Sequence, residues 1–182
     1  MDPFGELTGD HFRVPPSGFL ALPGDVLPPA AIREFDPGAI PPELRTTAGD
    51  IVFVSAVDRE AVKRFCADHG IPLRTRPDVW AALLEPYLDT EFSEQEQELT
   101  DALLRRAGLD GAAVQEIRDR VGSMVWQYNL VVWDWVHLGL ADLFEAATSS
   151  WVPEELRVAE VDQADFYRWA VRIAGRADHP GT

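Results

Sequence analysis

The sequence predicts an α+β fold that is mainly an α-helical bundle around one long central helix, with a small two- or three-stranded sheet and a proline-rich irregular N-terminal arm. Nine of the 14 prolines lie before residue 48, one β-favouring run occupies 51–54, and helical spacing dominates after residue 76. With 182 residues, 46% of them apolar, the chain is long enough for one domain with its own core. We expect a single domain, 1–182, that comprises an arm at 1–48, a small βαβ-like unit at 49–76 and a helical part at 77–178.

The arm is expected to be ordered but irregular. Proline fixes φ and removes a backbone donor, which excludes long helices and a central strand. Apolar side chains alternate with the prolines, and a disordered tail would contain fewer of them. We expect short extended pieces at 12–14 and 19–22 and one helical turn at 29–35.

The βαβ-like unit is expected from a strand, a helix and a short returning strand. Residues 51–54 read Ile-Val-Phe-Val, as in a strand that is covered on both faces. Ser55 and Asp58 make a capping-box pattern for the following helix, and Gly70 is its stop signal. Residues 71–73 could return as a parallel edge strand, since their proline cannot donate to a sheet interior.

The helical part contains the predicted central helix. Apolar spacing at 80–88 predicts a helix that its proline kinks or ends. Ser93 and Glu96 make a capping box for the next helix, and Gly108 ends it. Asp110 then caps a run that could continue to about residue 144, and a last helix follows residue 162.

Asp134 and His137 are the weak candidates for metal ligands. They form Asp-x-x-His, a spacing that di-iron carboxylate bundles use, and a continuous helix would place both on one polar stripe. That stripe is most economically the solvent face of the helix, and the sequence holds no second copy of the pair. We therefore expect no metal and no cofactor, and instead a hydrogen bond or ion pair from Asp134 to a neighbouring Arg or Trp.

Cys66 and His69 form Cys-x-x-His, which is too small a ligand set for zinc. The chain has one cysteine and three further histidines, so we expect Cys66 to be a buried packing residue. One cysteine also excludes an internal disulfide, and the acidic N-terminal segment is unlike a signal peptide. We expect a cytoplasmic protein.

Ser55, Arg74 and Arg76 are the candidate ligand-binding residues. Five bases stand between residues 59 and 76 against two acids, in a chain of net charge −15. All three residues follow the expected parallel strands, so they could face one crevice at the strand carboxyl ends and bind a small anion. No glycine-rich phosphate loop accompanies them, and pairing of the arginines with surface acids is the alternative.

The charge disfavours nucleic acid and anionic membranes as partners, because both are polyanions. The richest apolar stretch is interrupted by polar residues, so we expect no membrane span. Patterns of serine hydrolases, P-loop proteins, kinases and EF-hands are absent from the sequence.

The leading hypothesis is a non-enzymatic protein-binding or regulatory protein, of immunity or inhibitor type, whose acidic surface meets a protein partner. The alternative is an enzyme or small-anion-binding protein with its site near Ser55, Arg74 and Arg76. Five of the six tryptophans cluster in the C-terminal half, where we expect them to be core residues. Any exposed tryptophan would instead mark an interaction surface.

Overall fold

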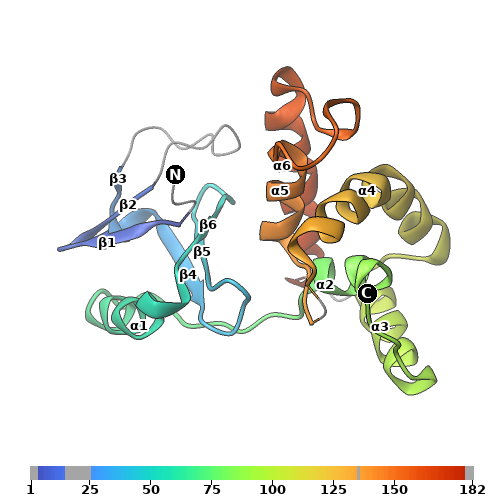
Figure 1. The fold of residues 1–182 in the computed structure, drawn as a ribbon. Helices are drawn as coiled ribbons and strands as arrows, with labels where there is room; N and C mark the ends of the chain where they lie inside the picture. Colours follow the sequence, from blue (N-terminus) through green and yellow to red (C-terminus); the bar gives the residue numbers. More distant parts are fainter. Residues whose placement is uncertain (1–3, 15–25, 135, 179–182) are drawn as a thin grey trace. The chain divides into compact units, whose positions relative to one another are not determined.

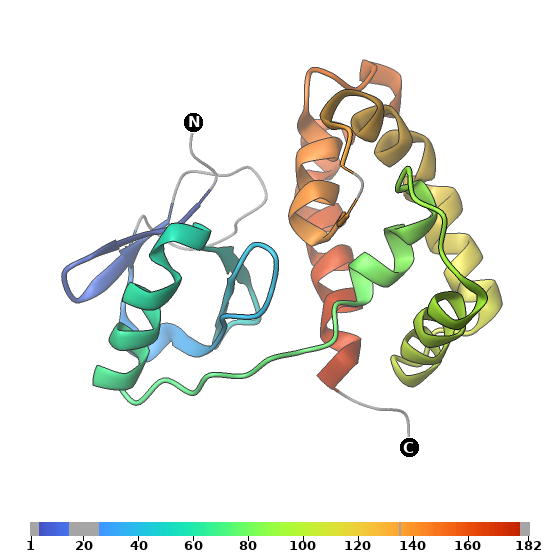
Figure 2. The same ribbon diagram turned by 60° about the horizontal axis from the view of Figure 1, so that its bottom comes forward.

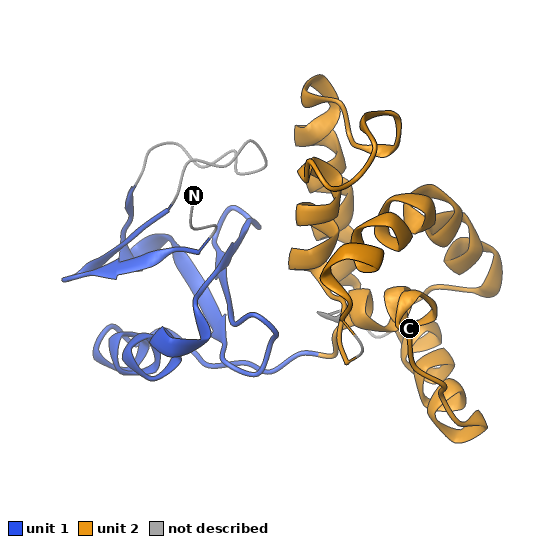
Figure 3. Ribbon diagram, viewed as in Figure 1, with its two compact units in different colours: residues 1–76 blue, residues 77–182 orange. Residues whose placement is uncertain are grey.

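The computed structural model of the chain describes residues 4–14, 26–134 and 136–178 (Figure 1). The chain divides into two compact units, unit 1 (residues 1–76) and unit 2 (residues 77–182) (Figure 3). The described strands and one α-helix belong to unit 1 and the other α-helices to unit 2, so the fold is α+β. That both units make one domain stays a prediction.

Unit 1 contains two small antiparallel sheets, with strand orders β1-β2-β3 and β4-β5-β6. Five of the six described strands begin within residues 1–48, so the predicted irregular arm is not confirmed for the described residues; the piece expected at 19–22 lies outside them. The described prolines of this segment, Pro28, Pro29, Pro37, Pro41 and Pro42, lie outside the strands, where no ladder donor is required. The strands are β1 (Glu6–Thr8), β2 (His11–Arg13), β3 (Val26–Leu27), β4 (Ile32–Asp36), β5 (Glu43–Thr46) and β6 (Ile51–Phe53).

Helix α1 (Arg59–Asp68) lies alongside the β4–β6 sheet (Figures 1 and 2). Its buried Val62, Phe65 and Cys66 join the core that the sheets form. The rings of Phe65 and Phe12 meet edge to face, with their centroids 5.6 Å apart. Gly70, at φ +68°, ends the helical segment as predicted.

The chain returns after α1 to the edge of the sheet opposite β6, where it runs parallel to β4. Leu73 forms a parallel bridge with Phe35 of β4, and the Arg74 N–H donates to the Phe35 carbonyl at 2.9 Å. The outer edge of β6 is already occupied, because the Gly5 N–H donates to the Phe53 carbonyl at 2.7 Å.

A buried ionic cluster fastens the returning segment to β4. Glu34 is 4% exposed, and its Oε1 accepts hydrogen bonds from Arg76 at 2.5 Å and from Arg33 at 2.9 Å. Burial alone would raise the pKa of Glu34, but the hydrogen bonds and charges of Arg33 and Arg76 outweigh it and hold the pKa below its ordinary value.

Unit 2 is organised around a short helix, α2 (Val79–Leu84), and not around the long one. Five of its six residues are buried, and it contacts α3, α4 and α6. The fully buried Trp80 donates its indole N–H to the Ala170 carbonyl of α6 at 2.9 Å. The other helices are α3 (Glu94–Arg106), α4 (Gly111–Val132), α5 (Leu140–Thr148) and α6 (Gln163–Ala174).

Short 3₁₀ turns connect or extend these elements. A helical turn was expected at 29–35, but the observed turn spans only Pro29–Ala31, because β4 begins at Ile32. No described helix is both long and apolar enough to cross a membrane. The 3₁₀ turns are η1 (Pro29–Ala31), η2 (Ala56–Asp58), η3 (Glu85–Tyr87), η4 (Glu154–Leu156), η5 (Glu160–Asp162) and η6 (Gly175–Asp178).

The local signals for helix ends in unit 2 are confirmed. The α-helical part of α2 ends at Leu84, two residues before the proline. Ser93 and Glu96 form both hydrogen bonds of a capping box. The Asp110 carboxylate accepts from the Ala113 N–H at 2.9 Å and caps α4.

The predicted long helix is interrupted between Val132 and Leu140. Trp133 has φ 54° and ψ 49°, a left-handed conformation that ends α4. The Asn129 side chain stabilises the turn, because its Oδ1 accepts from the Asp134 N–H at 2.8 Å and its Nδ2 donates to the Asp134 carbonyl at 3.1 Å. Helical spacing of apolar residues carries no signal of such a side-chain bond.

Replacing Glu34 with glutamine should lower the free energy of unfolding by about 3 kcal/mol, because the buried Arg76 guanidinium loses its counter-charge. Urea unfolding followed by circular dichroism measures the change. Arg74→Gln is the matched control, since the Arg74 side chain is 61% exposed and its loss should cost less than about 1 kcal/mol. An E34Q protein as stable as the parent would contradict this role of the cluster.

Candidate functional site

The structure brings Arg74 and Arg76 together but places Ser55 at the other edge of the sheet. Arg76 pairs with Glu34 at 2.5 Å, and Arg74 Nη1 lies 3.8 Å from Glu34 Oε2. Ser55 follows β6, and three strand spacings of about 4.8 Å separate β6 from the returning segment. Glu34 offsets only part of the charge of the two arginines, and a ligand-binding role for these three residues stays a prediction.

Asp134 and His137 lie in the connector between α4 and α5, and not on a helix face as predicted. Asp134 Oδ1 accepts hydrogen bonds from the backbone N–H groups of Val136 at 2.8 Å and His137 at 3.0 Å. The carboxylate therefore closes a turn of the connector. Among the described residues, no group of three His, Cys, Asp or Glu side chains is placed to hold a metal ion.

His137 attaches the connector to the N-terminus of α2. Its Nε2 lies 3.1 Å from Asp78 Oδ2, while Asp78 Oδ1 accepts from the Ala81 N–H at 2.9 Å. The hydrogen bond with Asp78 raises the pKa of His137, although burial opposes the shift. Asp142 caps the start of α5 by accepting from the Gly139 N–H, and burial raises its pKa.

Cys66 is a packing residue. It is fully buried in the core of unit 1, and burial raises the pKa of its thiol to about 11. A thiol with such a pKa is protonated at neutral pH, whereas the thiolate is the nucleophilic form.

A row of exposed apolar side chains on α4 is the main surface feature of unit 2. The exposed fractions are 51% for Trp126, 59% for Leu130 and 63% for Trp133. Trp126 and Leu130, four residues apart, lie on one side of α4, and Trp133 directly follows the last residue of the helix. We call these three residues the α4 aromatic stripe. The prediction that Trp126, Trp133 and Trp151 are core residues is wrong, and Trp135 lies outside the described residues.

Trp133 is held in a backbone conformation that is unfavourable for its residue type. A left-handed conformation costs a residue with a Cβ roughly 1–2 kcal/mol, and glycine or asparagine is usual at such a helix end. Trp133 is nevertheless mostly exposed. Strained residues of this kind are concentrated at functional sites.

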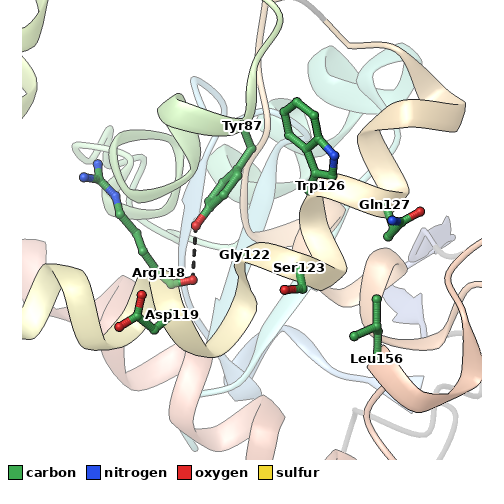
Figure 4. A pocket seen from close by; sticks show the side chains of 8 residues that line it. All are labelled: Tyr87, Arg118, Asp119, Gly122, Ser123, Trp126, Gln127 and Leu156. Carbon is green, nitrogen blue, oxygen red and sulfur yellow. Dashed lines mark hydrogen bonds between the residues drawn. The ribbon is translucent and has the colours of Figure 1, made fainter.

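An open groove of about 560 Å³ adjoins the stripe at Trp126 (Figure 4). The Tyr87 hydroxyl forms part of its wall and donates to the Arg118 carbonyl at 3.1 Å. Gly122 permits this approach, since a Cβ there would collide with the Tyr87 hydroxyl. Asp119, Ser123, Gln127 and Leu156 also line the groove.

Unit 2 carries most of the negative charge of the protein. It contains 20 acidic and 8 basic residues and no lysine, which makes its formal charge −12 of the total −15. Glu116 and Asp119 are exposed on α4 itself, before the stripe begins. The exposed indoles therefore belong to a strongly acidic unit.

The His137–Asp78 pair predicts a pH-dependent stability. A raised histidine pKa adds stability that is complete below the unfolded value of about 6.5 and is lost as the pH rises through the pKa of the folded protein. Asp78→Asn keeps a cap for α2 but removes the charge. We expect it to lower the free energy of unfolding by about 1 kcal/mol near pH 5.5 and by much less near pH 9.

Asp110→Asn is the control for this comparison. Asp110 caps α4 in the way that Asp78 caps α2, but its described contacts include no histidine. Its effect in thermal or urea unfolding should be the same at both pH values. An equal pH dependence of the two variants would show that the His137–Asp78 pair contributes nothing.

Comparisons of the chain with protein-family models, curated proteins and solved structures found no match. Its function therefore has to be inferred from its own surface and charge.

Proposed function

We propose that this chain is a non-enzymatic protein-binding protein of regulatory or inhibitor type, and that the α4 aromatic stripe contacts a basic protein partner. The observation that carries the proposal is Trp133, an exposed indole on a strained backbone. The Trp133 indole is 63% exposed although its backbone is left-handed, and tryptophan is strongly enriched at interaction hot spots.

The neighbouring residues supply the rest of an interface. Leu130 and Trp126 extend the apolar contact along one face of α4, and the groove beside Trp126 offers a concavity for a partner side chain. An apolar centre within a polar surround is the usual composition of a non-obligate interface. Trp151, also exposed, stacks on Tyr128 and is not part of the stripe.

The charge of unit 2 supports the proposal of a basic partner. A charge of −12 on this unit attracts a positively charged protein over a Debye length of about 8 Å at physiological ionic strength and accelerates the encounter. The same charge repels nucleic acid and anionic lipid. We place this function in the cytoplasm, which is supported by the single cysteine, Cys66, present as a free thiol.

The test compares two double variants of the full chain. Trp126→Ser with Trp133→Gly removes both indoles of the stripe and relieves the strained backbone, so we expect it to fold. A partner captured by the parent protein is purified, and its affinity is measured by calorimetry. We expect at least about 30-fold weaker binding for this variant, as for the loss of a hot spot worth 2 kcal/mol.

Trp151→Ser with Val161→Ser is the matched control, because both side chains are exposed and lie outside the stripe. This control should bind like the parent protein. The affinity of the parent should also fall as salt is added. Equal affinities of the two double variants, or a partner without net positive charge, would refute the proposal.

A further inference from the structure

We infer that the groove beside the stripe is a subsite for a cationic side chain of the partner, an arginine, which pairs with Asp119 and stacks on Trp126. This inference rests on the proposed function and specifies the partner's chemistry at one position. A guanidinium requires a carboxylate, further acceptors and a flat aromatic surface, and the groove provides all three.

The acceptors lie along one side of α4. Asp119 and Ser123 are exposed one helical turn apart, and Gln127 follows one turn later. Asp119 Oδ1 accepts one hydrogen bond, from Gln115 at 2.7 Å, and a carboxylate can accept several. Within the described part of the chain, the side chains of Ser123 and Gln127 form no hydrogen bond. A guanidinium has five N–H donors to share among these acceptors.

One of the two aromatic walls, Tyr87, is held in place before any ligand arrives. Tyr87 is fixed by its hydrogen bond to the Arg118 carbonyl and by its close approach to Gly122. Trp126 is the third member of the i, i+4, i+7 series that begins with Asp119 and Ser123, so its indole lies on the same side of α4 as the carboxylate. A cation over an exposed indole is attracted by the ring's electron density.

Arg118 also lines the groove, but its guanidinium is already bound. It donates to the Leu83 carbonyl at 3.0 Å and to the Ala82 carbonyl at 3.3 Å, at the C-terminal end of α2. Cations are favoured at helix C-termini, so this charge is compensated locally. Figure 4 shows the Arg118 guanidinium directed away from Ser123 and Gln127.

Titration of the ¹⁵N-labelled full chain with N-acetyl-arginine amide tests the subsite by NMR. We expect saturable shifts of the Trp126 indole, Gln127 side-chain and Ser123 backbone signals. N-acetyl-citrulline amide, which has nearly the same shape without charge, should produce none. N-acetyl-lysine amide should bind more weakly than the arginine probe, because its ammonium presents fewer donors in a fixed plane.

Asp119→Asn should weaken arginine binding by at least about fivefold, and Glu116→Gln is its matched control. Glu116 is equally exposed on α4 but does not line the groove, so its replacement should leave the affinity unchanged. Binding of citrulline as strong as that of arginine, equal effects of D119N and E116Q, or equal binding of the lysine probe would overturn the arginine subsite.

The two proposals fail separately. If the arginine probe does not bind while the affinity for the purified partner still depends on Trp126 and Trp133, the subsite is refuted and the protein-binding function stands. If the arginine probe binds at the groove but the stripe variant keeps full affinity for the partner, the proposed function is refuted instead.

Discussion

The burial of α2 is the constraint on which unit 2 depends. A helix of six residues has no independent stability in water, so tertiary contacts must hold it. Trp80 anchors it to α6, and both of its ends are completed by other elements. Asp78, held by His137 of the connector, caps the N-terminus, and Arg118 of α4 binds the carbonyls at the C-terminus. One short helix thereby links α4, α6 and the connector.

The exposed surface of α4 follows from this arrangement. Tyr87 lies just beyond α2, where its hydroxyl contacts α4 and its carbonyl accepts from the Asn129 side chain at 2.8 Å. The same asparagine binds Asp134 and thereby ends α4, so that the chain turns at Trp133. The groove wall and the left-handed Trp133 thus share one set of polar contacts. These contacts hold the backbone at the C-terminal end of α4, which would reduce the entropic cost of the proposed binding.

The two units differ in net charge. Unit 1 has a formal charge of −3, and its cluster of arginines surrounds the buried Glu34. Two of the basic residues that suggested an anion site, Arg74 and Arg76, thus pair with Glu34 within unit 1. Unit 2 has a charge of −12 and exposes its aromatic side chains. This difference favours a basic macromolecular partner over a small anion as the ligand of the protein.

Local signals in the sequence predict most of the helix ends, but the capping box expected from Ser55 and Asp58 is not formed, because neither side chain caps a helix. The confirmed signals depend on residues within one or two helical turns. They are the capping box at Ser93, the cap at Asp110 and the stops at Gly70 and Gly108. The Asp78 cap is equally local but is not among the predicted helix ends. Tertiary structure decided which edge of the sheet received residues 72–74, where α4 ended and which tryptophans stayed exposed. These outcomes depend on pairings between residues distant in sequence, such as Asn129 with Tyr87 and His137 with Asp78, and periodicity along one segment carries no information about them.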